Sequence, residues 1–217
     1  MMPHAILLAS TSVMTNDPVL LLLLTGAAVW VFLVWMVDYR AALAGKPNER
    51  ALPGATPVSP RAVVIGSLGA LFILAAETGG EHAFGLAAEQ SGMTALFSLY
   101  SILGAPVLEE VLFRGYLVIE KRGRAAQWGG IVGVSFLFAL LHPHLWEWTG
   151  DGLTVHAGAK GWLSTAVVVA GTLWLYAVRF FRLNPHRSLL PCFVGHATKN
   201  LGVFAIKYVQ GFVGGWW

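Results

Sequence analysis

Charged residues are scarce in this chain. Lysine, arginine, aspartate and glutamate make up 12% of its 217 residues, whereas an ordinary soluble domain carries about 25%. Hydrophobic residues account for 56%, which excludes a disordered chain. A water-soluble domain of this length could not bury so many apolar side chains, because too much of a small domain lies at its surface. The scarcity of charge therefore indicates an integral membrane protein.

Cysteine and internal repeats are also nearly or wholly lacking. The single Cys192 excludes a disulfide scaffold. No segment repeats along the chain, which disfavours a transporter built from two inverted halves. What the chain does contain is a series of long apolar runs, and a membrane-spanning helix needs about 20 such residues. The runs cover residues 19–37, 62–76, 94–118, 128–141, 162–178 and 189–209. We therefore predict an all-α, polytopic membrane helix bundle with about six transmembrane helices.

The basic residues are sorted between the connections. Ten lysines and arginines fall in the segments 38–61, 119–127 and 179–188, whereas the opposite set of connections holds only Lys160. By the positive-inside rule, both termini face away from the cytoplasm. The net charge of +3 thus concerns orientation in the lipid bilayer and does not indicate a nucleic-acid partner. We expect an integral protein of a prokaryotic plasma membrane, with no cleaved signal peptide in residues 1–18 and a flexible linker at 45–60.

Ionisable residues inside the apolar runs cost about 2.5–3.5 kcal/mol each, so a set of them points to a functional site. Glu110 and Arg114 are spaced i, i+4 and can form an ion pair that lowers the cost of burial. Glu109 lies about 100° further round the helix. It remains an unpaired carboxylate in a poorly solvated place, which suits a general base. The alternative is a purely structural ionic cluster in which the two carboxylates share one arginine.

Two further clusters occur on later runs. Phe138 and His142 share a helix face, although a lone histidine at a helix end is more often interfacial, and the nearby His144 is the solvent-exposed candidate. His196 and Asn200 also share one face, and their two donors would suit an oxyanion. The alternative for this pair is a polar seam between helices.

The roles of two residues near this pair stay open. Cys192 could form a thiol–imidazole dyad with His196, but an inert buried cysteine is favoured. Lys199 either reaches towards the membrane surface or raises the local positive potential.

Taken together, Glu-Glu-x-x-x-Arg at 109–114, Phe-x-x-x-His at 138–142 and His-x-x-x-Asn at 196–200 resemble the signature motifs of the CPBP family. This family comprises the CAAX prenyl endopeptidases and the bacteriocin-processing (Abi) intramembrane proteases. The resemblance covers about residues 100–204. It divides the chain into N-terminal membrane-anchoring helices with a cytoplasmic linker, at 1–93, and a catalytic helix core at 94–217.

The resemblance implies a glutamic-type intramembrane endopeptidase, without a cofactor, that cleaves a membrane-associated or exported protein or peptide. Glu109 would activate water together with His142, while His196 and Asn200 would stabilise the oxyanion. Glu110 and Arg114 would hold the site in shape, and Phe138 would support it. For these residues to meet, the third helix must kink at Pro106 or the sixth must begin beyond Leu190 and Pro191.

Two alternatives remain. A divalent metal such as zinc could be held by Glu109, His142 and His196. A non-catalytic membrane protein, such as a bacteriocin-immunity factor or a proton-coupled carrier, could also bury these groups. A binding protein, however, has no need of both a base and an oxyanion pair.

Overall fold

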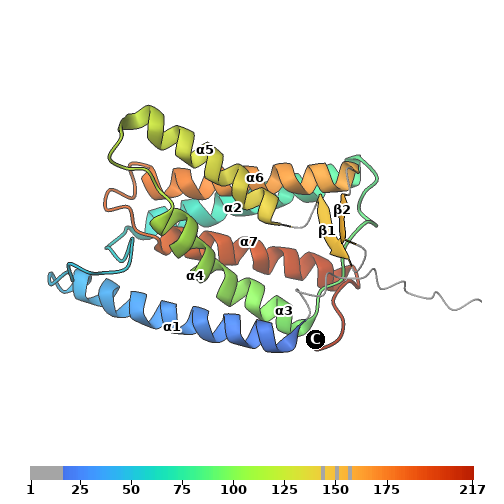
Figure 1. Cartoon of the computed structure of the whole chain (residues 1–217), viewed down its shortest axis with the longest axis horizontal. Coiled ribbons are helices and arrows are strands. Elements are labelled where there is room, and N and C mark those ends of the chain that lie inside the picture. The colour runs from blue at the N-terminus through green and yellow to red at the C-terminus, as the bar shows by residue number, and fades with distance from the viewer. Residues whose placement is uncertain (1–16, 143–144, 150–151, 156–157) are drawn as a thin grey trace, which may run out of the picture.

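The computed structural model describes residues 17–142, 145–149, 152–155 and 158–217. His144 and nearly all of the segment considered for a signal peptide lie outside the described residues. Within them the chain forms a bundle of long helices, shown in Figure 1. The predicted all-α membrane bundle is confirmed, and the protein is an integral membrane protein.

Six helical rods and one short hairpin make up the described part of the chain. The third rod is composite: α3, η1, α4 and η2 follow one another without a break, and η1 and η2 are π-helical. We call it the α3–η2 rod. The elements are α1 (Pro18–Leu43), α2 (Pro60–Ala83), α3 (Ala95–Leu99), η1 (Tyr100–Gly104), α4 (Ala105–Glu109), η2 (Glu110–Tyr116), α5 (Gly123–Leu141), β1 (Trp146–Thr149), β2 (Gly152–Val155), α6 (Ala159–Phe180) and α7 (Leu190–Val209).

The helices begin where the sequence provides capping groups. The Asp17 carboxylate accepts hydrogen bonds from the amides of Val19 and Leu20 at 2.8 and 3.1 Å, and Pro18 occupies the first turn of α1. The Ser59 hydroxyl caps α2 through the amide of Ala62, again before a proline. These side chains satisfy amides that have no partner within the helix. The capping residues therefore fix where the first two helices start.

Five rods are long and apolar enough to cross a membrane: α1, α2, the α3–η2 rod, α5 and α6. The α7 helix has the length of a span but not the apolar composition, because it carries His196, Lys199, Asn200 and Lys207. It packs mainly against α2 and also contacts α6, α4 and η1. Figure 1 shows it running through the middle of the bundle. The polar residues of α7 are therefore placed inside the protein, where other side chains can meet them.

The connections sort to the two ends of the bundle. The segments 44–59, 117–122 and 181–189 lie at one end, and the β1–β2 hairpin, the start of α1 and the C-terminus lie at the other (Figure 1). The three segments at the first end are those that contain or adjoin most of the basic residues. The charge asymmetry along the sequence is thus an asymmetry between the ends of the molecule.

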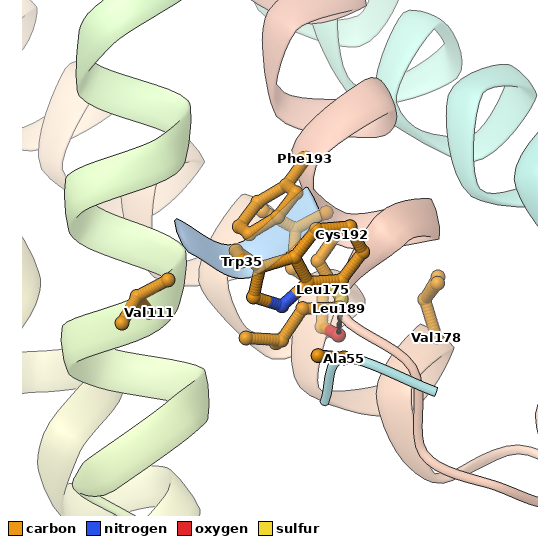
Figure 2. Packing of buried hydrophobic residues seen from close by; sticks show 8 residues of the cluster. All are labelled: Trp35, Ala55, Val111, Leu175, Val178, Leu189, Cys192 and Phe193. Atoms are coloured by element: carbon orange, nitrogen blue, oxygen red, sulfur yellow. Dashed lines mark hydrogen bonds between the residues drawn. The ribbon is translucent and has the colours of Figure 1, made fainter. Parts of the chain in front are cut away.

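A hydrophobic core lies near the basic end, where α1, η2, α6 and the start of α7 meet. Trp35 is fully buried there and packs edge-on against Phe193, with ring centroids 5.0 Å apart. Cys192 belongs to the same cluster, and Figure 2 shows its sulfur directed at a backbone oxygen. That bond runs from Sγ to the Leu175 carbonyl at 3.3 Å. The thiol is therefore part of the core packing, as expected of a buried structural cysteine.

Candidate active site

A cavity of about 840 Å³ opens inside the bundle, between α2, the α3–η2 rod, the end of α5, α6 and α7. The four candidate catalytic residues all line it: Glu109, His142, His196 and Asn200. Arg114 and Phe138 line it as well, whereas Glu110 is completely buried behind its wall. The structure therefore brings together residues from three rods that are up to 91 positions apart in the sequence.

The convergence depends on an irregular helix. The α7 helix begins at Leu190, so the irregularity lies around Pro106, where the single α-helical turn of α4 stands between two π-helical stretches. A π-helical turn holds an extra residue and so shifts the facing of every side chain after it. Such turns are frequent at functional sites. A distortion at Pro106 was expected from the sequence, but its π-helical form was not.

Pro106 leaves one backbone carbonyl without a helical partner. The amide of Ala105 bonds to the Tyr100 carbonyl in the π register, so the next amide in that register would serve Ser101. That amide belongs to Pro106, which has no N–H. The Ser101 carbonyl instead accepts a hydrogen bond from Nδ2 of Asn200, at 2.7 Å. The amide side chain of Asn200 is thus tied to the α3–η2 rod at a position that the proline exposes.

Glu110 is the centre of a buried ionic cluster. Its Oε1 lies 3.2 Å from Nη1 of Arg114, the ion pair expected from their spacing, and both side chains are buried. The same oxygen lies 2.8 Å from Nδ1 of His196. Since a carboxylate only accepts hydrogen bonds, Nδ1 of His196 carries the hydrogen. The bond from His196 to Glu110 was not anticipated from the sequence, where Glu110 was assigned only to Arg114.

Arg114 is also enclosed by aromatic rings. Its guanidinium carbon lies 4.8 Å from the ring centroid of Phe138 and 5.2 Å from that of Tyr176. The Tyr176 hydroxyl in turn donates to the Phe113 carbonyl at 2.7 Å. Cation–π contacts of this kind lower the cost of burying a guanidinium. The rings thus hold Arg114, and Arg114 provides the countercharge for Glu110.

Glu109 has a different environment from its neighbour in sequence. Its side chain is 24% exposed, and its Oε2 lies 3.8 Å from Nε2 of His196. That separation is too long for a hydrogen bond. Oε2 makes no hydrogen bond to any of the residues that the structure describes. One carboxylate of the pair is therefore fixed by two partners, whereas the other lines the cavity and keeps a buried oxygen without a hydrogen bond to the described residues.

His142 ends α5 and is held by Phe138. Its Nδ1 lies 2.9 Å from the Phe138 carbonyl, and its ring lies 4.6 Å from the Phe138 ring. The carbonyl can only accept, so Nδ1 carries the hydrogen, and in the neutral ring Nε2 carries the lone pair. The same Phe138 ring contacts Arg114. The Phe-x-x-x-His motif therefore connects the histidine to the Glu110–Arg114 cluster.

A second set of polar residues in the cavity was not predicted from the sequence. Lys199 pairs with Glu77 at 3.0 Å, and Lys160 forms an ion pair with Glu81. The predicted apolar run ended at residue 76, but α2 continues to Ala83 and presents both glutamates to these lysines. The otherwise unexplained Lys199 was the available signal. Tyr100 also lines the cavity, and nothing in the sequence pattern pointed to it.

The arrangement brings a carboxylate, two imidazoles and a side-chain amide to one cavity. These are the groups that hydrolysis by general acid–base catalysis with oxyanion stabilisation requires. As for the proposed metal site, no group of three or more histidine, cysteine, aspartate or glutamate side chains in the described residues is placed to hold a metal ion. Glu109, His142 and His196 therefore do not form a ligand set in this arrangement.

Comparison with known protein families identifies the part of the chain that contains these residues. The family model described as Type II CAAX prenyl endopeptidase Rce1-like matches residues 91–202, a stretch that contains all three motifs. Neither a curated protein nor a solved structure matches the chain.

Proposed function

Because the chain belongs to the Rce1-like type II CAAX prenyl endopeptidase family, we propose that it hydrolyses a peptide bond in a membrane-associated or exported protein or peptide. Membership of this family implies an intramembrane protease and a protein substrate. The specific substrate class, the roles of the residues and the orientation in the membrane are our proposals. The observation that carries them is the Glu109 carboxylate at the cavity wall, with its Oε2 3.8 Å from Nε2 of a histidine that Glu110 holds in place.

In the proposed reaction, Glu109 takes a proton from a water molecule in the cavity. His142 accepts a hydrogen bond from the same water through Nε2, because its Nδ1 is engaged with the Phe138 carbonyl. The water oxygen then attacks the carbonyl carbon of the scissile peptide, and the carbonyl oxygen becomes an oxyanion. When the C–N bond breaks, Glu109 returns the proton to the leaving nitrogen. The carboxylate is thus regenerated in each cycle.

The oxyanion is stabilised by donors from α7. His196 donates to it through Nε2 while its Nδ1 donates to Glu110 at 2.8 Å, so both ring nitrogens carry a hydrogen in this step. Asn200 donates through the side-chain hydrogen that is not engaged with the Ser101 carbonyl. Donors fixed before the reaction are worth more than mobile ones, because they need no reorganisation as the charge develops.

For the orientation, we propose that the basic end of the bundle faces the cytoplasm and that both termini face away from it. The three connections gathered at that end in Figure 1 support this, because they contain most of the basic residues. Reporter fusions at residue 48, in the connection between α1 and α2, and after residue 217 test it. We expect the fusion at residue 48 to report a cytoplasmic location and the fusion after residue 217 the opposite side. If both fusions report the same side of the membrane, the proposed topology is contradicted.

The test of the function is the substitution Glu109→Gln, which keeps the shape of the side chain but removes the base. We expect cleavage to fall by about 10²–10⁴-fold, with unchanged amounts of folded protein in the membrane. Comparative proteomics of membrane and secreted fractions should then show one or a few uncleaved precursors. Glu49→Gln, at an exposed position in the linker, is the matched control. Full cellular function of the Glu109→Gln protein would favour the non-catalytic alternative, an immunity factor or a carrier.

A further inference from the structure

Arg179 lies apart from the catalytic cavity, in the last turn of α6. It is only 4% exposed, yet its Nε and Nη1 atoms have no hydrogen-bond partner among the described residues. A guanidinium keeps its charge at any ordinary pH. A buried cation without full partners is costly and calls for an anion. The surroundings of Arg179 are therefore a candidate anion-binding site.

The side chain lines a second cavity, of about 630 Å³, at the basic end of the bundle. Its wall is formed by the connection between η2 and α5, with Glu120, Lys121 and Arg122, together with the aliphatic Val118 and Ile119. Gly115, which follows Arg114 in η2, also belongs to the wall. We propose that this cavity binds the phosphate group of an anionic phospholipid.

The charges around the cavity are unbalanced. Glu120 is the only carboxylate among the described residues that line the cavity, and Nη1 of Arg187 already binds Oε2 of Glu120 at 2.7 Å. Arg179 reaches the other oxygen of Glu120 only at 3.9 Å. Lys121 and Arg122 add two more exposed cations. Four basic side chains therefore share one carboxylate, and a phosphate would supply the missing negative charge through charge-assisted hydrogen bonds.

The loop after α6 is built to hold this charge cluster in place. The buried amide of Asn184 donates to the carbonyls of Val178, Arg179 and Ser188. Arg187 follows in the left-handed region, with φ of 54°, and is the one non-glycine residue with positive φ in the described chain. Such a conformation is costly for an arginine. The structure thus accepts backbone strain at the residue that engages Glu120.

A phospholipid fits better than a soluble phosphate because apolar surface adjoins the basic groups. Leu117 and Ile119 are each 42% exposed on the same connection. A phosphate held by Arg179 would have acyl chains beside these side chains. The connection between η2 and α5, which lines the cavity, lies at the end of the bundle where the basic connections gather (Figure 1). Basic residues at a membrane surface attract anionic headgroups.

Purified protein in neutral detergent tests the proposal, with phosphatidylglycerol and phosphatidylcholine added in parallel. We expect phosphatidylglycerol to remain bound in native mass spectrometry and to raise the melting temperature, whereas phosphatidylcholine should do neither. Arg179→Gln should weaken phosphatidylglycerol binding about tenfold, the loss of one charge-assisted hydrogen-bonding group. Arg50→Gln, an exposed arginine of the linker, is the control and should bind as the wild type does.

Arg179→Gln is a buried substitution, so a second variant tests the site from its exposed edge. Lys121→Gln/Arg122→Gln should fold normally and also lose the preference for phosphatidylglycerol. Equal binding of both lipids by the wild type, or unchanged binding by both variants, would overturn the proposal. An equal, Arg179-dependent stabilisation by inorganic phosphate alone would overturn the lipid assignment, since it would show a site for the soluble ion.

Discussion

Nδ1 of His196 lies 2.8 Å from Oε1 of Glu110, a carboxylate with no exposed surface. The contact joins α7 to the α3–η2 rod at the point where both contribute to the cavity. Because Glu110 is enclosed, its charge acts on His196 with little screening by water. A buried carboxylate thus fixes both the position of the imidazole and which nitrogen carries the hydrogen.

Glu110→Gln should therefore lower the rate of cleavage through His196. A glutamine oxygen can still accept the hydrogen from Nδ1, but the hydrogen bond is weaker because the acceptor is no longer charged. In the proposed mechanism we expect kcat to fall about 10²-fold, the usual effect of weakening an oxyanion donor, with little change in KM. Steady-state kinetics on an identified substrate would measure this. An unchanged kcat in a stably folded variant would show that the Glu110 carboxylate does not act on the reaction through His196.

Arg114→Ala is expected to damage stability as well as activity. The substitution leaves Glu110 with no cationic arginine at 3.2 Å and empties the space between the rings of Phe138 and Tyr176. Breaking a buried pair by removing one partner costs about 3–5 kcal/mol. Thermal unfolding in detergent should show a clear drop in the melting temperature. Arg114→Lys keeps the charge but not the flat guanidinium, so its melting temperature should lie between those of the wild type and Arg114→Ala. A melting temperature equal to that of the wild type would exclude a structural role.

Much of the fold could be predicted from the sequence, because membrane spans are signalled by length and hydrophobicity. The six runs correspond to the six rods, and the i, i+4 spacing of Glu110 and Arg114 produced the ion pair that it suggested. These features are local, since each depends on residues a few positions apart. The three motifs were recognisable for the same reason.

Features that depend on contacts between distant segments were missed. The run ending at residue 76, which was short but could be extended, continues as a helix to Ala83, and the ion pairs that Glu77 and Glu81 make there with lysines on α7 and α6 were not predicted. No local pattern could show these partners. The π-helical turns were missed because hydrophobic periodicity does not distinguish an inserted residue within a span from a regular helix. The buried position favoured for Cys192 is confirmed, since its thiol lies in the core and bonds to the Leu175 carbonyl.

The pair of Glu77 and Lys199 gives a test of the unexpected part of the cavity. Their charged atoms lie 3.0 Å apart, with side chains 18% and 19% exposed. Lys199→Met alone leaves a partly buried glutamate without this cation, and we expect a loss of about 1–2 kcal/mol. Adding Glu77→Gln removes the unpaired charge, so the double variant should recover part of the lost stability. Such a recovery in the melting temperature measures the coupling. Additive losses would mean that the pair does not act as a unit.

Pro106 and Asn200 provide a test of how the proline affects the site. The proline has no amide to offer to Ser101, and Nδ2 of Asn200 donates to that carbonyl at 2.7 Å. Pro106→Ala restores an N–H that competes for the Ser101 carbonyl and loosens the hold on Asn200. We therefore expect kcat to fall about fivefold, the value of one hydrogen bond. Stability should be unchanged or higher, since the helix gains a backbone donor.

A double-mutant cycle separates this effect from a general distortion of the helix. Asn200→Ala should lower kcat by about 10²-fold, as the loss of an oxyanion donor does. If Pro106 acts by positioning Asn200, then adding Pro106→Ala to Asn200→Ala should change kcat no further, because the side chain to be positioned is gone. If Pro106 instead sets the facing of Glu109 through the π-helical turns, the two losses should multiply. A multiplied loss would therefore refute the link between the proline and the amide, and would point to Glu109 as the group that the proline controls.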